Sequence, residues 1–270
     1  MTGAVVDRLR QAQPGDHFLW RVGSAGNHVD TASAVVAEAR ARGRRVLVFG
    51  PTDGPVLAAL WASADAVVDP AASLMADGRV SPAPVLARVR EEAEAARQDG
   101  FTGLYVWADM DWARATRGSV ALFTALELLV DRELAALGVT AVCAYPSSFD
   151  DEMLDQLRCV HELDIGIEHS APFRLTAGRS GPGWVLSGYV GADGRTAFAE
   201  GLDALLDQAD CRIDLDALEA IDADALHLLA EKARRSFGTV TLTRVPPSVA
   251  AQWRAGGFDT LAPNVIVRSA

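Results

Sequence analysis

The stretch IDLDALEAIDADAL, from Ile213 to Leu226, decides how the C-terminal part of the chain is interpreted. Ile213 and Leu215 alternate with Asp214 and Asp216, which is the pattern of a strand with one polar face. From Leu226 onward the apolar residues recur on roughly one side of a helix. The stretch therefore predicts a short strand, a turn and the start of a helix.

The end of this stretch also resembles a STAS domain, the fold of anti-sigma-factor antagonists. In that family a strand runs into Asp-Ser-Ser-Gly at a helix N-terminus, and the first Ser is phosphorylated. The matching residues here are Asp222, Ala223, Asp224 and Ala225. The resemblance implies a STAS switch position that cannot be phosphorylated, because Ala223 has no hydroxyl. Alternatively, Asp222 and Asp224 only cap the helix and suit its dipole.

The rest of the C-terminal part agrees with an α/β domain over residues 183–270. Apolar runs and turn residues predict strands and helices in alternation: a strand at 184–190, a helix at 197–208, a strand at 239–243, a helix through Trp253 and a strand at 265–267. We expect a four- or five-stranded mixed sheet with outer helices. Gly and Pro residues mark 166–182 as a linker or a hairpin.

Strands also alternate with helices throughout residues 15–165, which form the N-terminal part. Continuous apolar runs such as Val46–Phe49 and Leu104–Trp107 are typical of buried parallel strands. The pattern predicts an α/β fold with a mostly parallel sheet sandwiched by helices. Such sheets bind ligands beyond the carboxyl ends of their strands.

Six residues near these strand ends are candidate ligand-binding residues: Trp20, His28, Trp107, Asp109, Asp111 and Trp112. Indole rings beside a strand-end loop can line an apolar pocket, and they can equally belong to the core. The two aspartates could hold Mg²⁺ or transfer protons, but without a phosphate loop or a nucleophile we favour a structural turn. For His28 the simpler interpretation is a surface loop residue.

Nucleotide hydrolysis is disfavoured because the phosphate-binding lysine is missing. The loop from Gly23 to His28 follows a strand and precedes a helix, where a phosphate-binding loop would lie. However, the chain lacks the spacing G-x-x-x-x-G-K-[ST], and its only lysine is Lys232. Nucleotide binding through backbone amides alone remains an alternative.

The N-terminal part resembles a MEDS domain, the methanogen and methylotroph DcmR sensory domain. The resemblance rests mainly on the run Ala-Asp-Met-Asp-Trp-Ala at 108–113 and on Cys143-Ala144-Tyr145, which is followed later by His161. It implies a fold similar to the RecA/KaiC ATPases without the phosphate loop, and a role in sensing small organic molecules. Glu162 follows His161, where the family often has a proline. The resemblance covers about residues 15–165, and residues 1–165 are taken as the sensor domain.

Composition narrows the classes of partner. The formal net charge is -11, and 15 of the 25 basic and 24 of the 36 acidic residues fall in residues 1–171. This acidic excess, without a basic stripe, argues against direct nucleic-acid binding and disfavours an anionic ligand or membrane in the N-terminal part. Three cysteines without CxxC spacing predict buried thiols in a reducing, cytoplasmic setting. The five histidines show no HxxxH or HxH spacing, so neither a metal site nor a cofactor is expected.

Together these features predict a non-enzymatic signalling regulator with no catalytic residues. A small-molecule sensor domain would be coupled to a STAS-type module that binds a protein partner, with anti-sigma-factor kinases as the partner class and transcription regulation as the setting. The alternative is a nucleotide-binding protein, or a weak ATPase, on a degenerate RecA-like fold.

Overall fold

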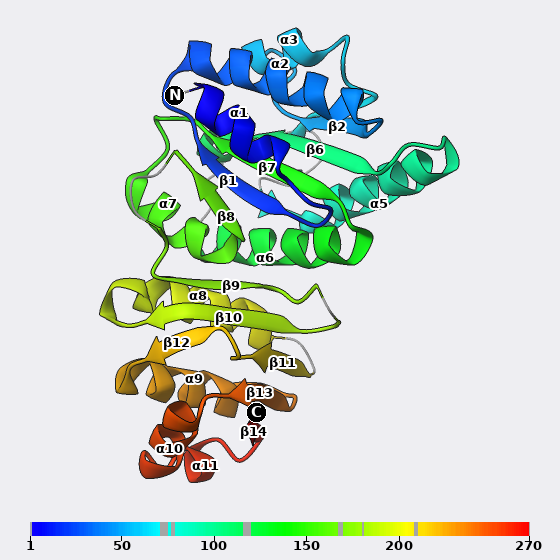
Figure 1. Cartoon of the computed structure of the whole chain (residues 1–270). Helices are drawn as coiled ribbons and strands as arrows, with labels where there is room; N and C mark the ends of the chain where they lie inside the picture. Colours follow the sequence, from blue (N-terminus) through cyan, green and yellow to red (C-terminus); the bar gives the residue numbers. More distant parts are fainter. Residues whose placement is uncertain are drawn as a thin grey trace. The chain divides into compact units, whose positions relative to one another are not determined.

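A computed structural model describes residues 2–70, 75–76, 79–115, 120–166, 170–179, 181–207 and 210–269 (Figure 1). The chain forms two compact units, and each unit contains one large sheet. Both sheets alternate with helices along the chain, so the α/β fold predicted from the sequence is confirmed.

The first sheet has six strands, all parallel, in the order β3-β2-β6-β7-β1-β8. The strands are β1 (His17–Arg21), β2 (Arg45–Phe49), β3 (Ala66–Val68), β6 (Leu104–Asp109), β7 (Thr140–Tyr145) and β8 (Leu163–Ile165). Their residues are almost all buried, as continuous apolar runs in a parallel sheet require. A separate two-stranded ribbon pairs β4 (Met75–Ala76) with β5 (Arg79–Val80).

Helices alternate with these strands. They are α1 (Thr2–Arg10), α2 (Ala25–Ala41), α3 (Pro55–Leu60), α5 (Pro82–Gln98), α6 (Val120–Leu137) and α7 (Asp151–Leu157), with short 3-10 segments η1 (Met110–Ala115) and η2 (Arg158–Val160). One apolar core joins α1, α2 and α3 to one face of the first sheet. Because strand side chains alternate between faces, this face carries Trp20 of β1 and Trp107 of β6, whereas His17 and Cys143 point to the opposite face.

The second sheet is mixed. Its path is β12-β10-β11-β13-β14, and β9 pairs antiparallel with β10 while the other pairs are parallel. The strands are β9 (Phe173–Ala177), β10 (Trp184–Val190), β11 (Cys211–Asp214), β12 (Leu218–Ile221), β13 (Val240–Val245) and β14 (Val265–Ser269). Between them lie η3 (Ala192–Gly194), α8 (Arg195–Leu206), α9 (Ala223–Arg235), α10 (Pro247–Ala255) and α11 (Phe258–Leu261).

The structure differs from the sequence prediction at two places. The helix expected after the loop from Gly23 to His28 begins inside it, at Ala25, because Ser24 provides the N-cap and its hydroxyl accepts from the Asn27 amide. The stretch from Ile213 to Leu226 contains a second strand, β12, before the helix, so the sheet has six strands with β9 included. In the segment predicted as a linker or a hairpin, β9 forms a hairpin with β10; residues 167–169 and 180 lie outside the described residues.

Candidate functional site

Three aromatic rings from distant parts of the sequence meet on one face of the first sheet. The Trp20 ring centroid lies 5.6 Å from that of Trp107 and 5.6 Å from that of His28, both edge-on, and His28 lies 6.1 Å from Trp107. Trp20 comes from β1, Trp107 from β6, and His28 from the first turn of α2. We refer to these three residues as the Trp–His–Trp cluster.

Two nitrogen atoms of the cluster are buried without a hydrogen-bond partner among the described residues. They are Nε2 of His28 and Nε1 of Trp107, whose side chains are 7% and 0% exposed. A buried polar atom left unpaired costs roughly 1–3 kcal/mol, so such atoms are rare in folded proteins and call for an explanation. The indole N–H can only donate, whereas an imidazole nitrogen can accept or donate. Each of the two nitrogens therefore has a hydrogen-bonding capacity that the described residues leave unused.

Burial keeps His28 neutral. It lowers the pKa of His28 from 6.5 to about 4, an effect that the negative charge of Asp111 partly opposes. The expectation that His28 is a surface loop residue is therefore wrong: the side chain is buried on a helix. At neutral pH the cluster presents an uncharged imidazole and two indoles, which suits an uncharged ligand.

Asp109 and Asp111 follow this face at the end of β6. Asp109 is 4% exposed, its Oδ1 accepts from the Asp111 amide at 3.1 Å, and Gly50 lies against its Cβ. Burial raises the pKa of Asp109 to about 6, with the Asp111 charge adding to the rise and the amide hydrogen bond opposing it. Asp111 is exposed, and Trp112 is buried in η1. The hydrogen bond from the Asp111 amide to Asp109 is consistent with the structural turn predicted from the sequence. With a pKa of about 6, Asp109 also changes its charge near that pH.

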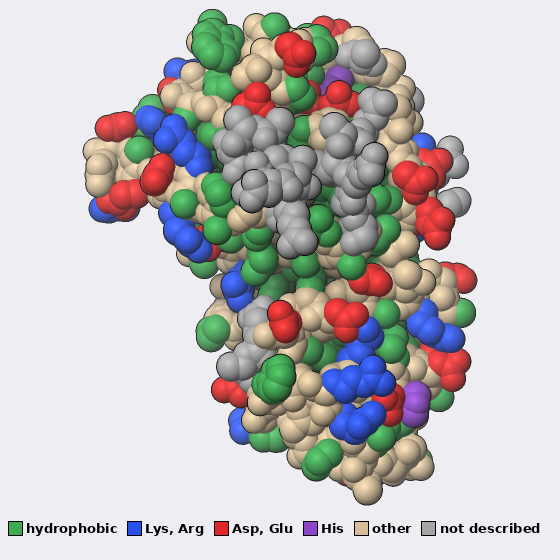
Figure 2. Space-filling view, turned by 180° about the vertical axis from the view of Figure 1, so that it is seen from behind, with side chains coloured by type: hydrophobic (Ala, Val, Ile, Leu, Met, Phe, Trp, Pro, Cys, Tyr) green, Lys and Arg blue, Asp and Glu red, His purple; other side chains and the backbone are tan. Residues whose placement is uncertain are grey.

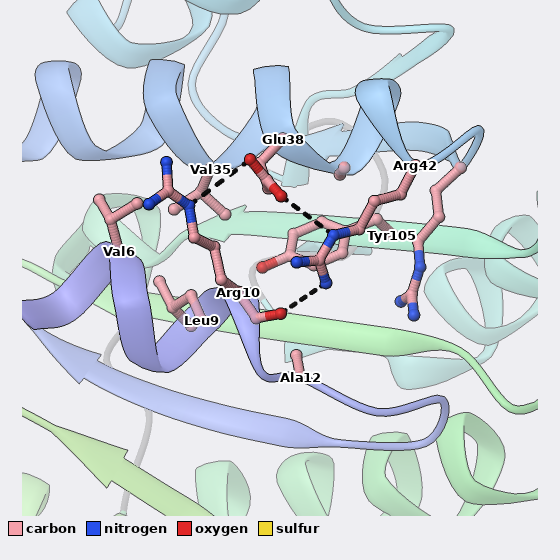
Figure 3. Close-up of a pocket in the computed structure, with 10 residues that line it drawn as sticks. Val6, Leu9, Arg10, Ala12, Val35, Glu38, Arg42 and Tyr105 are labelled. Carbon is pink, nitrogen blue, oxygen red and sulfur yellow. Dashed lines mark hydrogen bonds and ion pairs between the residues drawn. The ribbon is translucent and has the colours of Figure 1, made fainter.

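A small pocket lies beneath α1 and α2, and the sequence did not predict it (Figure 3). It encloses about 20 Å³, which is room for roughly one water molecule. The Tyr105 hydroxyl at this pocket is buried without a hydrogen-bond partner among the described residues, and burial raises its pKa. Glu38 contacts both Arg10 and Arg42 across the lining. The volume excludes an organic ligand and matches the size of one water molecule.

The second domain places its switch position on the surface. Asp222 is the N-cap of α9, and its Oδ1 accepts from the Ala225 amide at 2.7 Å. Arg195 lies 3.1 Å from both Asp222 and Asp224, so one guanidinium bridges the two carboxylates. Ala223 and Asp224 are exposed. The capping role proposed for Asp222 is thus observed, and it leaves the Ala223 position open to a partner.

Sequence spacing missed one buried contact, in which Nε2 of His17 lies 3.4 Å from Sγ of Cys143. The two residues are 126 positions apart in the sequence. No local motif can indicate such a contact, because only the pairing of β1 with β7 brings the two residues together. The three cysteines are buried, as expected, and form no disulfide among the described residues.

These features define the class of protein: a signalling or regulatory protein in which a sensory domain precedes a STAS domain. Residues 16–162 match the MEthanogen/methylotroph, DcmR Sensory domain (MEDS), and residues 175–267 match the family described as Mlab, STAS domain. The first match covers more than half of the chain, and the chain belongs to the MEDS family. No curated protein matches it.

Both resemblances inferred from the sequence are thereby confirmed. The match adds no assignment of ligand, partner or reaction to any residue. A separate finding bears on the membrane: in the parts of the chain that the structure describes, every helix is too short or too polar to cross a bilayer.

Proposed function

We propose that the first domain senses a small, mostly uncharged molecule at the Trp–His–Trp cluster, and that the STAS domain passes this state to a protein partner without enzymatic turnover. The observation that supports the proposal best is the pair of buried, unpaired nitrogens on His28 and Trp107. A ligand carrying one hydroxyl or carbonyl group could bond to one or both of them. The neutral imidazole and the acidic excess of residues 1–171 both disfavour an anion.

For the second domain the proposal is binding of a protein, with an anti-sigma-factor kinase as the partner class. The switch position Asp222, Ala223 and Asp224 lies at the start of α9, where an incoming protein can reach it. On the face seen in Figure 2, described basic side chains lie beside acidic ones instead of forming a stripe. That mixture suits a protein surface better than a nucleic-acid backbone.

A thermal-shift screen of the full chain tests the sensor. The panel contains small alcohols, ketones and amides, with ATP and Mg²⁺ as the anionic comparison. A ligand at about a hundred times its dissociation constant stabilises the folded state by roughly 2.7 kcal/mol. We expect neutral compounds to raise the melting temperature; shifts by nucleotides alone would favour the alternative of a nucleotide-binding protein on a RecA-like fold.

Two variants then locate the site. Trp107→Phe keeps a ring but removes the buried N–H donor, and we expect it to weaken the binding of any ligand found by the screen. Trp61→Phe is the matched control, because Trp61 is 63% exposed on the same domain. Equal affinity in both variants would place the ligand elsewhere.

A further inference from the structure

We propose that the small pocket beneath α1 and α2 binds one halide ion such as chloride. We refer to it as the Tyr105 pocket (Figure 3). All ten lining residues fall within residues 1–118, which belong to the first compact unit. The Tyr105 pocket is separate from the Trp–His–Trp cluster, because none of the three cluster residues lines it. The inference therefore does not depend on the sensor proposed above.

Strand pairing fixes the place of Tyr105 in the pocket. The residue lies in β6, between Val46 of β2 on one side and Thr140 of β7 on the other. Its ring belongs to the apolar core that joins α1, α2 and α3 to this face of the first sheet. Tyr105 is 3% exposed, and its hydroxyl has no hydrogen-bond partner among the described residues. The pocket therefore contains one buried hydroxyl with an unused hydrogen bond.

This hydroxyl can serve as a donor. Burial raises the pKa of Tyr105, although the charges of Arg44 and Arg42 partly oppose the rise, so the phenol keeps its proton at neutral pH. A buried hydroxyl that is left without a partner destabilises the folded state. A halide ion accepts hydrogen bonds and cannot donate them, so it matches the unpaired O–H of Tyr105.

Two arginines of the lining repel each other near this hydroxyl. Burial is the main cause that lowers the pKa of Arg44, and the charge of Arg42 lowers it further, whereas Tyr105 and Asp16 raise it. Arg44 donates through Nη1 to Oγ1 of Thr140 at 2.6 Å. Within the described part of the chain, its Nε and Nη2 make no hydrogen bond. Arg44 thus has donors left for an anion, which would also offset its repulsion by Arg42.

The lining as a whole is positively charged. Glu38 is its only acidic residue, and its carboxylate contacts Arg10 at 3.5 Å and Arg42 at 3.0 Å, as Figure 3 shows. Three arginines and one glutamate give the lining a formal charge of +2. Asp7, which is not a lining residue, contacts Arg10 at 3.1 Å on the exposed side. One halide ion would lower the charge of the lining to +1.

This local charge acts on a bound ion more strongly than the acidic excess of residues 1–171 does. The interaction between two charges weakens with distance, and salt screens it over about 10 Å. Apolar side chains of Val6, Leu9 and Val35 form part of the wall. They keep the local dielectric low, which strengthens the attraction between the ion and the arginines.

The volume of the pocket selects a monatomic ion. It encloses about 20 Å³, more than the roughly 10–15 Å³ that one water molecule needs. Chloride and bromide are only slightly larger than water, whereas phosphate, sulfate and carboxylates have several heavy atoms and do not fit. A water molecule would fit as well, but it has no charge to offset that of the arginines. The tests below distinguish these two occupants.

The first test follows thermal unfolding of the full chain in sodium chloride, sodium bromide and sodium gluconate. The protein is prepared in gluconate without halide, and mixtures of the salts keep the ionic strength constant. Gluconate is too large for the pocket. We expect chloride and bromide to raise the melting temperature by several degrees and to saturate, since an ion that binds only the folded state stabilises it. A melting temperature that does not rise, or rises without saturating, would overturn the proposal.

A variant of one atom tests the donor. Tyr105→Phe removes only the hydroxyl, and we expect it to fold because no described residue bonds to that hydroxyl. Its halide affinity, taken from the same titration, should fall at least tenfold. Tyr189→Phe is the matched control, since Tyr189 is 47% exposed and does not line the pocket, and its affinity should not change. Equal affinities in the two variants would refute the halide site.

A second pair of variants tests the charge, and it keeps the proposal testable if Tyr105→Phe fails to fold. Arg44→Gln removes one charge from the lining, and we expect at least a tenfold loss of halide affinity. Arg8→Gln removes the same charge from an exposed residue of α1 outside the lining, and its affinity should stay within twofold. The same loss in both variants would reflect the net charge of the domain and contradict a specific site.

Bromide also locates the ion directly. Crystals of the full chain grown without halide are soaked in bromide, and anomalous differences are measured at the bromine absorption edge. We expect a peak in the Tyr105 pocket beside the hydroxyl. Density there without an anomalous signal would be a water molecule and would exclude the halide. Because these readouts use no organic ligand, they stand or fall independently of the sensor proposal.

Discussion

The Trp–His–Trp cluster of the first domain and the N-terminus of α9 in the second present polar groups in opposite ways. In the cluster, polar atoms are enclosed: His28 is 7% exposed and Trp107 is fully buried. At α9 the polar groups face outward, and Arg195 neutralises part of the charge of Asp222 and Asp224. Enclosure shifts pKa values and leaves atoms unpaired, which suits recognition of a small molecule. Exposure leaves a charged surface, which suits recognition of a protein.

The largest expected effect comes from emptying the buried cluster. Trp107→Ala removes a fully buried indole, and large-to-small changes of this kind cost about 3–5 kcal/mol of unfolding free energy. Trp61→Ala makes the same chemical change at a side chain that is 63% exposed, and we expect a change within about 0.5 kcal/mol. Denaturant unfolding followed by circular dichroism measures both. Equal losses of unfolding free energy in the two variants would mean that the Trp–His–Trp cluster is not an enclosed region.

The second prediction uses the two shifted pKa values. Between pH 4 and 6.5, unfolded His28 binds a proton that the folded state lacks, so this residue makes stability rise with pH. Between pH 3.8 and 6, folded Asp109 binds a proton that the unfolded state lacks, so this residue makes stability fall as pH rises. Each residue contributes a slope of up to about 1.4 kcal/mol per pH unit in its window.

Single variants separate these opposing slopes. Compared with the unmodified protein, the unfolding free energy of His28→Gln should rise less steeply, or fall more steeply, as the pH rises. That of Asp109→Asn should rise more steeply, or fall less steeply. Unfolding measured at half-unit steps from pH 4 to 7 tests both. If both variants change the slope in the same direction, the two groups do not lie in the buried environment described above.

The sequence predicted the elements best where patterns were long. The strand predicted at 184–190 agrees to the residue with β10. β12 was missed because Glu219 and Ala220, both exposed, interrupt a four-residue strand and leave no alternating pattern. The start of α2 was missed because Ser24 was taken as part of the loop from Gly23 to His28, although Ser is equally a helix cap.

The candidate site was only partly predictable for a similar reason. Trp20, His28 and Trp107 could be singled out because they lie at strand ends or in a loop after a strand, and the structure brings these three rings together. Neither the burial of His28 nor the pKa of Asp109 could be inferred, since both depend on what packs over them. The contact between His17 and Cys143 depends on strand order, which sequence spacing does not encode.

A smaller effect is expected at the helix cap of the second domain. Asp222→Ala removes the acceptor of the Ala225 amide and should cost about 1 kcal/mol. Asp222→Asn keeps a capping oxygen but loses the ionic contact with Arg195, so we expect a loss below about 0.5 kcal/mol. Denaturant midpoints for the two variants separate capping from charge. A larger loss for the Asn variant would mean that the ion pair outweighs the cap.

The smallest effect on stability is expected at Ala223. Its side chain is exposed, so a substitution there should affect partner binding and not the stability of the fold. Ala223→Ser places a hydroxyl where the STAS family carries its phosphorylated serine, and the unfolding free energy should change by less than about 0.5 kcal/mol. A phosphate there would add roughly twice the negative charge of Asp224, at the end of α9 whose dipole favours anions.

Incubation with anti-sigma-factor kinases and ATP, followed by mass spectrometry of residues 220–226, tests the partner class. We expect no phosphate on the unmodified chain and phosphate on Ser at position 223 of the variant when a cognate kinase docks. Phosphate on this segment of the unmodified chain would contradict the prediction that the STAS switch position cannot be phosphorylated. If the variant binds a kinase but is not phosphorylated, we would attribute the block to the carboxylates of Asp222 and Asp224, which Arg195 bridges beside position 223.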